Sequence, residues 1–206
     1  QDPAAKLAVL AAGLTPGQKV LDACAAPGGK SFASAIVMGN EGSITSCDLH
    51  AHKKGLIEAS AARLGLTCIT AQVADGKKPK KGWEGAFDTV IADVPCSGYG
   101  IIRKKPDIRY KDLAQTEALP PLQGRILDNQ ARYVKPGGGL LFSTCTILPR
   151  ENEAVAEEFL KKHPDFALET VEYPDGSGIL SAGMTTLLPC DHDTDGFFIC
   201  KCRRKP

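Results

Sequence analysis

Short stretches rich in Val, Ile and Leu alternate with helix-like segments along this chain, and this alternation constrains the fold more than any other feature. The predicted strands are Lys19 to Ala23, Ser43 to Cys47, Cys68 to Val73, Thr89 to Ala92, Gly139 to Thr144, Ala167 to Val171 and Phe197 to Cys202. The predicted helices are Ser31 to Val37, His52 to Leu64, Ala114 to Val134 and Glu151 to Lys162. Such alternation predicts a mostly parallel sheet with helices on both faces, in one α/β domain over residues 1–206.

Length and charge exclude several other classes of protein. The 206 residues can bury one core, and the longest apolar runs, such as Leu7 to Leu14, are shorter than the roughly 18 residues of a membrane span. The chain begins Gln1-Asp2-Pro3 without an initiator Met, so we expect it to be a piece of a longer protein. The net charge of +1 does not by itself indicate a nucleic-acid partner, although the basic residues are grouped.

The eight cysteines fit free thiols better than a disulfide framework or a zinc site. No Cys-x2-Cys pair is present, and Cys200 and Cys202 have the alternate spacing of one face of a strand. Free thiols are typical of a reducing cytoplasm, which is where we expect the protein. We expect no metal and no membrane association.

The stretch CAAPGGKS, between the first predicted strand and the first predicted helix, is a glycine loop of the kind that contacts a nucleotide. A phosphate loop of the Gly-x4-Gly-Lys-Ser type would need glycine where Cys24 stands. A Gly-x-Gly-x-x-Gly dinucleotide fingerprint is absent as well, since only Gly28 and Gly29 are present. An ordinary tight turn remains as the non-functional alternative.

A loop around the methionine part of S-adenosylmethionine fits these residues better. This compound has no phosphate, so it needs close approach of the backbone, which Pro27 and the two glycines allow. Asp48 ends the second predicted strand and Asp75 follows the third. An acid after the second strand is the usual ligand of the ribose hydroxyls in such sheets, and we place the other near the adenine.

Two cysteines follow neighbouring strands further along the chain. Cys96 lies in Asp93-Val94-Pro95-Cys96-Ser97, and Cys145 in Ser143-Thr144-Cys145-Thr146. Either alone is more often a buried structural thiol. Together, beside a methyl donor, they indicate covalent catalysis on cytosine: a thiolate adds to carbon 6, carbon 5 then takes the methyl group, and the thiolate is expelled. The thiol needs local activation, and Asp93 is placed to act as the acid near the ring nitrogen.

The set DACAAPGGKS, SCDLH, ADG, DVPCSGYGIIRKKPDIRY, KPGGGLLFSTCTI and TDGFF resembles the RNA 5-methylcytosine methyltransferases. Within that family it is most similar to the bacterial small-subunit ribosomal RNA enzymes of the RsmB type. The resemblance covers nearly the whole chain. It implies a class I, Rossmann-like methyltransferase fold, with a seven-stranded sheet whose last strand is antiparallel.

The resemblance also implies roles for individual residues. Cys145 is then the nucleophile, and Cys96 assists release of the methylated RNA. DNA cytosine methyltransferases are similar in chemistry but use the cysteine of the Pro-Cys pair, here Cys96. Thr146 stands where family members often have Ser. The residues implied to contact S-adenosylmethionine, whose product is S-adenosylhomocysteine, are Cys24, Ala25, Ala26, Pro27, Gly28, Gly29, Lys30, Asp48, Asp75 and Asp93.

The expected substrate is a cytosine in small-subunit ribosomal RNA before full assembly, bound by a monomer. Arg103, Lys104 and Lys105 are the candidates for contacts with the flanking phosphates, although such a run is also common as plain solvated surface. The resemblance implies an RNA-binding region before the point where this chain begins. Two alternatives remain open: a transfer-RNA cytosine methyltransferase, and a non-catalytic RNA-assembly module.

Overall fold

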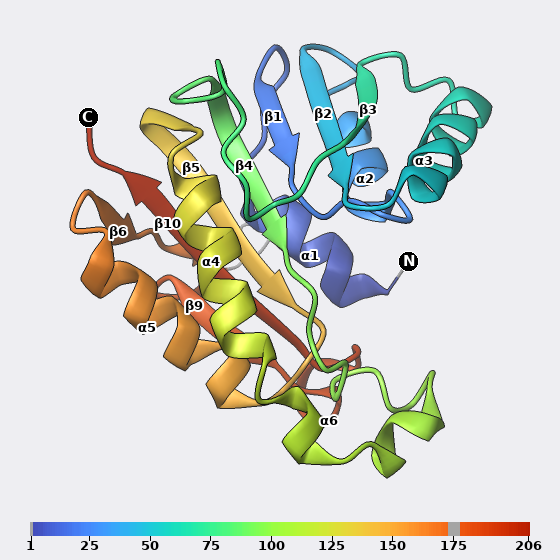
Figure 1. Ribbon diagram of the computed structural model, residues 1–206, viewed down its shortest axis with the longest axis vertical. Helices are drawn as coiled ribbons and strands as arrows, with labels where there is room; N and C mark the ends of the chain where they lie inside the picture. Colours follow the sequence, from blue (N-terminus) through green and yellow to red (C-terminus); the bar gives the residue numbers. More distant parts are fainter. Residues whose placement is uncertain (1, 173–177) are drawn as a thin grey trace.

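A mostly parallel sheet runs through the protein in the computed structural model, which describes residues 2–172 and 178–206 (Figure 1). Seven of the described strands follow in the order β3-β2-β1-β4-β5-β10-β6, and β9 pairs with the outer edge of β10. Their bounds are β1 Lys19–Asp22, β2 Ser43–Asp48, β3 Ile69–Val73, β4 Phe87–Asp93, β5 Val134–Thr144, β6 Phe166–Leu168, β9 Met184–Leu187 and β10 Phe197–Arg204. A separate hairpin joins β7 Val171–Glu172 to β8 Ile179–Ser181.

The directions of the strands confirm the predicted fold. The neighbours β2–β3, β1–β2, β1–β4 and β4–β5 pair in parallel, whereas β10, the last strand, is antiparallel to both β5 and β6. The described residues add β9 as an eighth strand that was not predicted. The two cysteines predicted to share a face of the last strand do so, since the Sγ atoms of Cys200 and Cys202 are 3.7 Å apart.

Helices cover both faces of the sheet (Figure 1). Their bounds are α1 Pro3–Ala11, α2 Gly29–Val37, α3 Ala51–Arg63, α4 Leu119–Ala131, α5 Glu153–Lys162 and the single turn α6 Pro189–His192, with 3-10 turns η1 Pro106–Tyr110, η2 Leu113–Thr116 and η3 Pro149–Glu151. Helices α4 and α5 lie on one face, while α1 and α2 lie on the other. No helix within the described ranges combines the length and hydrophobicity needed to cross a membrane.

Two apolar cores, one on each side of the sheet, hold these layers together. Along β5, Leu140 and Phe142 join the core under α4 and α5, whereas Leu141 between them joins the core under α1 and α2. This is the period-2 alternation of a strand that is buried on both faces. The near-continuous apolar runs of the sequence are therefore the central strands of a covered sheet.

The structure differs from the prediction in three elements. The helix predicted over Ala114 to Val134 is split, because Pro120 and Pro121 occupy the first turn of α4, where a missing N–H costs nothing, and Val134 already begins β5. The strand predicted over Ala167 to Val171 is divided between β6 and β7, which belong to different sheets. Helix α1 was not predicted, although its start carries a capping pattern: Asp2 accepts a hydrogen bond from the Ala4 N–H at 2.9 Å.

The parallel strands β1, β2, β3, β4 and β5 all end at the same edge of the sheet. The segment between β4 and α4, with its turns η1 and η2, extends beyond this edge (Figure 1). Ligand sites of open α/β sheets lie at such carboxyl ends. The fold thus collects at one edge the residues that were predicted to bind the cofactor and to carry out the reaction.

Candidate active site

A cavity of about 180 Å³ opens at the carboxyl ends of β1, β2 and β3. Cys24, Asp48 and Asp75, three of the predicted cofactor residues, line it together with Pro95 from the loop after β4. Asp48 is buried, and its Oδ1 accepts a hydrogen bond from the His50 N–H at 3.0 Å. The ribose hydroxyls and the amino group of an adenosine compound donate hydrogen bonds, and two carboxylates on neighbouring strand ends can accept them. These residues therefore fit an adenosine compound.

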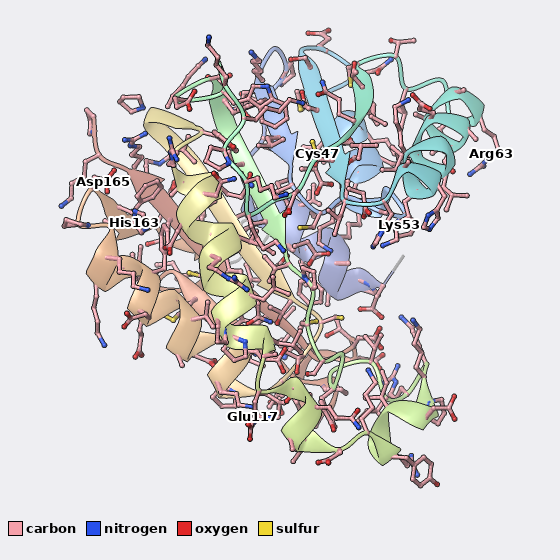
Figure 2. All side chains as sticks on the ribbon, in the orientation of Figure 1. Cys47, Lys53, Arg63, Glu117, His163 and Asp165 are labelled. Atoms are coloured by element: carbon pink, nitrogen blue, oxygen red, sulfur yellow. The ribbon has the colours of Figure 1, made fainter. Side chains whose placement is uncertain are left out.

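The glycine loop supplies the wall of this cavity next to β1. Its backbone is tied to β2 by the Ala25 N–H, which donates to the Cys47 carbonyl at 2.7 Å, and Cys47 is marked on β2 in Figure 2. Gly28, at a φ of 109°, begins α2 in a left-handed conformation, and a Cβ there would lie 2.3 Å from the Phe32 ring. The left-handed backbone and the nearby Phe32 ring therefore favour glycine at this turn.

Not every predicted cofactor residue faces the cavity. Pro27 and Gly29 line a wider groove between α1 and α2, on the other side of the loop. Residues that the sequence did not single out complete the cavity wall: His50, Lys53, Lys77, Leu122 and Ile126. Lys53, labelled in Figure 2, lies in the first turn of α3, with its Nζ 3.6 Å from Asp48 Oδ2. The position of Lys53 soon after the second strand could have indicated from the sequence that it lies near the cavity. The sequence has no such signal for Ile126, which lines the cavity because of how α4 packs.

Lys30 does not line the cavity either, because its side chain is turned toward Asp93 at the end of β4. Lys30 Nζ is 2.5 Å from Asp93 Oδ2, and the Ser143 hydroxyl donates to Asp93 Oδ1 at 2.8 Å. Lys30 is buried and its Nζ lies 5.0 Å from the centre of the Phe197 ring. Both carboxylate oxygens of Asp93, the predicted catalytic acid, therefore have hydrogen-bond partners. One partner is Lys30, which had been predicted to contact the cofactor.

The two predicted catalytic cysteines meet at the ends of β4 and β5. Cys96 Sγ and Cys145 Sγ are 3.2 Å apart, although 49 residues separate them in the chain. The hydrogen bond from Cys96 lowers the pKa of Cys145, and the charge of Lys30 acts in the same direction, against burial. The same hydrogen bond, followed by burial, raises the pKa of Cys96 well above its ordinary value. These opposite directions make Cys145 the candidate for the thiolate of the pair.

Cys24, the third cysteine near this edge, has different electrostatics. Burial raises its pKa, and the nearby carboxylates of Asp22, Asp93 and Asp48 add to that shift. A thiol in such surroundings stays protonated at neutral pH and is a poor nucleophile. The candidate nucleophile is therefore Cys145.

A buried polar network fixes the loops that carry the two cysteines. The Ser97 hydroxyl and the Thr146 hydroxyl are 2.8 Å apart, and each residue directly follows one of the cysteines. Glu151 and Asn152, both fully buried, contact the same loops from the turn before α5. Glu151 had been predicted as the first residue of a helix, and only the folded chain shows that it is buried next to the two cysteine loops.

The three basic residues predicted to contact RNA lie in the segment beyond the carboxyl edge. Lys104 Nζ is held by Asp2 at 2.6 Å and by Asp195 at 2.7 Å. Arg103 lies 3.7 Å from the fully exposed Asp193, while Lys105 makes no ion pair within the described residues. The charge of Lys104 is therefore already compensated, and Lys105 is the most available of the three for a phosphate.

Within residues 2–172 and 178–206, His, Cys, Asp and Glu side chains form no group of three that could hold a metal ion. The two thiols, the Lys30–Asp93 pair and the neighbouring cavity together suit covalent addition to an electrophilic ring beside an adenosine compound.

Comparison with known proteins gives the relatives of this chain. The family described as 16S rRNA methyltransferase RsmB/F matches residues 9–203. A probable ribosomal RNA small subunit methyltransferase B of Bacillus subtilis (strain 168) is 44% identical over 100% of this chain and 47% of the relative. The chain thus spans about half the length of the curated relatives that it matches.

Solved structures agree with the fold. The crystal structure of PH0851 is 33% identical, with a TM-score of 0.92 over 99% of this chain and 46% of that chain. The crystal structure of NSun6 from Pyrococcus horikoshii with SFG is 25% identical, with a TM-score of 0.86 over 100% of this chain and 53% of that chain. Both neighbours therefore share the fold of this chain over nearly its whole length.

Proposed function

Since the chain belongs to the family described as 16S rRNA methyltransferase RsmB/F, we propose that it transfers a methyl group from S-adenosylmethionine to carbon 5 of a cytosine in small-subunit ribosomal RNA. The observation that carries the proposal is the Cys96–Cys145 pair, whose sulfur atoms are 3.2 Å apart beside the cavity. A methyltransferase that acts on a nucleophilic nitrogen or oxygen needs no thiol at this position. Carbon 5 of cytosine does, because it is too weak a nucleophile until a thiolate has added to carbon 6.

S-adenosylmethionine would be held by Asp48 and Asp75 and by the backbone of the loop that contains Cys24 and Gly28. When bound, it supplies an electrophilic methyl group. The acids at the ends of β2 and β3 would orient its adenosine part. A structural neighbour of this chain, NSun6 from Pyrococcus horikoshii, was solved with SFG, which supports S-adenosylmethionine as the cofactor.

Cys145 starts the reaction as a thiolate. Its sulfur electron pair forms a bond to carbon 6 of the cytosine, and the ring nitrogen that gains electron density takes a proton. Both Asp93 oxygens already accept hydrogen bonds, one from Lys30 and one from Ser143. In this proposal Lys30 is therefore the source of the proton that Asp93 passes to the ring. Carbon 5 of the resulting enamine is then nucleophilic enough to take the methyl group.

Cys96 completes the reaction by removing the proton of carbon 5. Before addition, the Cys145 thiolate holds Cys96 protonated and raises its pKa. Once the Cys145 sulfur is bonded to carbon 6, that negative charge is gone, and Cys96 ionises more easily. Cys96 loses its S–H proton to water and, as a thiolate, accepts the carbon 5 proton. The electrons of the broken C–H bond restore the ring double bond, the Cys145 thiolate leaves carbon 6, and the ring nitrogen returns its proton through Asp93 to Lys30.

RNA contacts are proposed for the segment beyond the carboxyl edge. Lys105 and Arg103 would hold phosphates on either side of the target, and a cytosine in folded RNA has to be unpaired or extruded to reach the thiols. The exposed Tyr110, with 82% of its surface accessible, lies in the same segment and offers a ring on which an unpaired base can stack.

A denaturing gel tests the proposed chemistry. Unmodified small-subunit ribosomal RNA and S-adenosylmethionine are mixed with parent protein, Cys96→Ser or Cys145→Ser. A protein–RNA band that survives denaturation should accumulate with Cys96→Ser, because serine cannot accept the carbon 5 proton, and should be missing with Cys145→Ser. The reverse pattern would mean that Cys96 is the nucleophile. Transfer RNA in a parallel set tests the substrate, since an equal band with both RNAs contradicts the ribosomal assignment.

A further inference from the structure

Glu151 is a fully buried carboxylate whose position is not explained by the chemistry described so far. It lies in η3, the turn that connects the Cys145 loop to α5, and none of its surface is exposed. Its Oε2 accepts hydrogen bonds from the Ser97 N–H at 2.9 Å and from Gln123 Nε2 at 3.1 Å. Burying a carboxylate costs free energy unless hydrogen bonds compensate for the lost contact with water. The role of Glu151 should therefore be sought in the two groups that donate to it.

Both donors belong to the support of Cys96. Ser97 directly follows Cys96, and Gln123 Nε2 also donates to the Pro95 carbonyl, directly before Cys96, at 3.0 Å. Glu151 and Gln123 therefore hold the backbone on each side of Cys96. Both of these side chains are buried away from solvent, so water cannot replace the hydrogen bonds if one of them is removed.

The neighbouring residue, Asn152, does the same for Cys145. Asn152 Oδ1 accepts from the Thr144 hydroxyl at 2.6 Å, and its Nδ2 donates to the Thr146 carbonyl at 2.9 Å. These two partners flank Cys145 in the chain. Two adjacent buried residues thus fix one cysteine each, and removing Glu151 leaves the hydrogen bonds around Cys145 in place.

We propose that Glu151, together with Gln123, is a positioning residue that holds Cys96 against Cys145 for the release step. The inference rests on the proposed function, because it concerns the step in which Cys96 takes the carbon 5 proton. Without Glu151 the Pro95–Ser97 loop loses the hydrogen bond to the Ser97 N–H, while the Asn152 hydrogen bonds around Cys145 remain. The enzyme then forms the covalent adduct and resolves it slowly, on the order of tenfold to 100-fold slower for a displacement near 1 Å.

The test follows the covalent protein–RNA band with time after RNA and S-adenosylmethionine are added to parent, Glu151→Ala, Glu151→Gln, Cys96→Ser and the control Glu153→Ala. Glu153 is the next acid along the chain, and its Oε1 accepts from the Thr186 hydroxyl, away from the cysteines. The band should decay about tenfold to 100-fold more slowly with Glu151→Ala than with parent, and it should persist with Cys96→Ser. It should decay at the parental rate with Glu153→Ala. Glu151→Gln should decay within about threefold of parent, because its amide oxygen accepts from the same two donors.

This readout separates positioning from general damage. A merely destabilised enzyme forms less adduct and turns over less, whereas the proposed role predicts more adduct at lower turnover. Rapid decay of the band with folded Glu151→Ala would overturn the inference while leaving the proposed function intact, provided that Cys96→Ser accumulates the band. Absence of a band with Cys96→Ser would instead contradict the proposed function.

Gln123→Ala keeps the inference testable if Glu151→Ala does not fold. This variant removes the donor to the Pro95 carbonyl and leaves the Glu151–Ser97 hydrogen bond. It should slow the decay of the band, by less than Glu151→Ala would. Decay at the parental rate with folded Gln123→Ala would overturn the proposal as well.

Discussion

Asp22, beneath the glycine loop, should make this protein less stable as the pH rises from about 4 to about 7. The side chain is fully buried at the end of β1, where burial raises its pKa from 3.8 to about 6, against the hydrogen bond from Ser31. Ser31 Oγ donates to Asp22 Oδ2 at 2.7 Å, and Oδ1 has no partner within the described residues. Of the charged groups that act on Asp22, Lys30 lowers its pKa and Asp93 raises it.

The sign follows from linkage. A carboxyl group whose pKa is higher in the folded state than in the unfolded state contributes stability that is present below the unfolded value and lost as the pH rises through the folded value. A shift from 3.8 to about 6 corresponds to about 3 kcal/mol in total. Roughly half of that loss should fall between about pH 5 and pH 8, so the Asp22 contribution to the free energy of unfolding should drop by about 1 to 2 kcal/mol.

Urea unfolding of parent and Asp22→Asn across this pH range measures the effect. The substitution removes the titration, so the difference in unfolding free energy should change with pH by about 1 to 2 kcal/mol in favour of the variant at high pH. Asp88→Asn is a control whose pH dependence has the opposite sign and falls below about pH 5, so its difference from parent should stay constant over this range. Burial acts against the charge of Asp88, but hydrogen bonds from Lys135 and the Lys19 N–H lower its pKa, so its stabilisation should disappear on acidification. Parallel curves for parent and Asp22→Asn, within about 0.5 kcal/mol, would refute the argument.

Three other substitutions test the site. Gly28→Ala should destabilise the fold by about 1 to 3 kcal/mol, because its Cβ would lie 2.3 Å from the Phe32 ring at a φ of 109°. The same substitution should weaken S-adenosylmethionine binding, measured by calorimetry. The control Gly39→Ala, also at positive φ but with no atom within 4 Å of the added Cβ, should leave binding unchanged. Lys30→Met should lower the free energy of unfolding in urea by about 3 kcal/mol, because it leaves the partly buried Asp93 carboxylate without its ion-pair partner. Turnover should fall even where the variant is folded. Full turnover would contradict the proposed transfer of a proton from Lys30 through Asp93 to the ring. Lys105→Ala should reduce the salt dependence of RNA binding by about one phosphate contact, and an unchanged slope in filter binding would remove this residue from the interface.

Much of the fold could be predicted because its signals are local. Runs such as Gly139 to Thr144 have to be buried on both faces, and apolar runs that alternate with helices have few other arrangements. The errors occur where long-range pairing decides the outcome. The segment Ala167 to Val171 has the composition of one strand. In this part of the chain, however, β10 pairs with Phe166–Leu168, whereas Val171 joins a different sheet.

The candidate site divides in the same way. The sequence by itself was enough to predict that Cys96, Cys145, Asp48 and Asp75 lie at one edge of the sheet, because each follows or ends a strand and the carboxyl ends of parallel strands share one edge. Only the tertiary structure decided how these groups act on one another. The distance of 3.2 Å between two sulfur atoms, the pairing of Lys30 with Asp93 and the burial of Glu151 depend on contacts across 49, 63 and 54 residues of chain. Local composition cannot encode such contacts, because protonation and positioning depend on burial and on neighbours that only the packed sheet brings together.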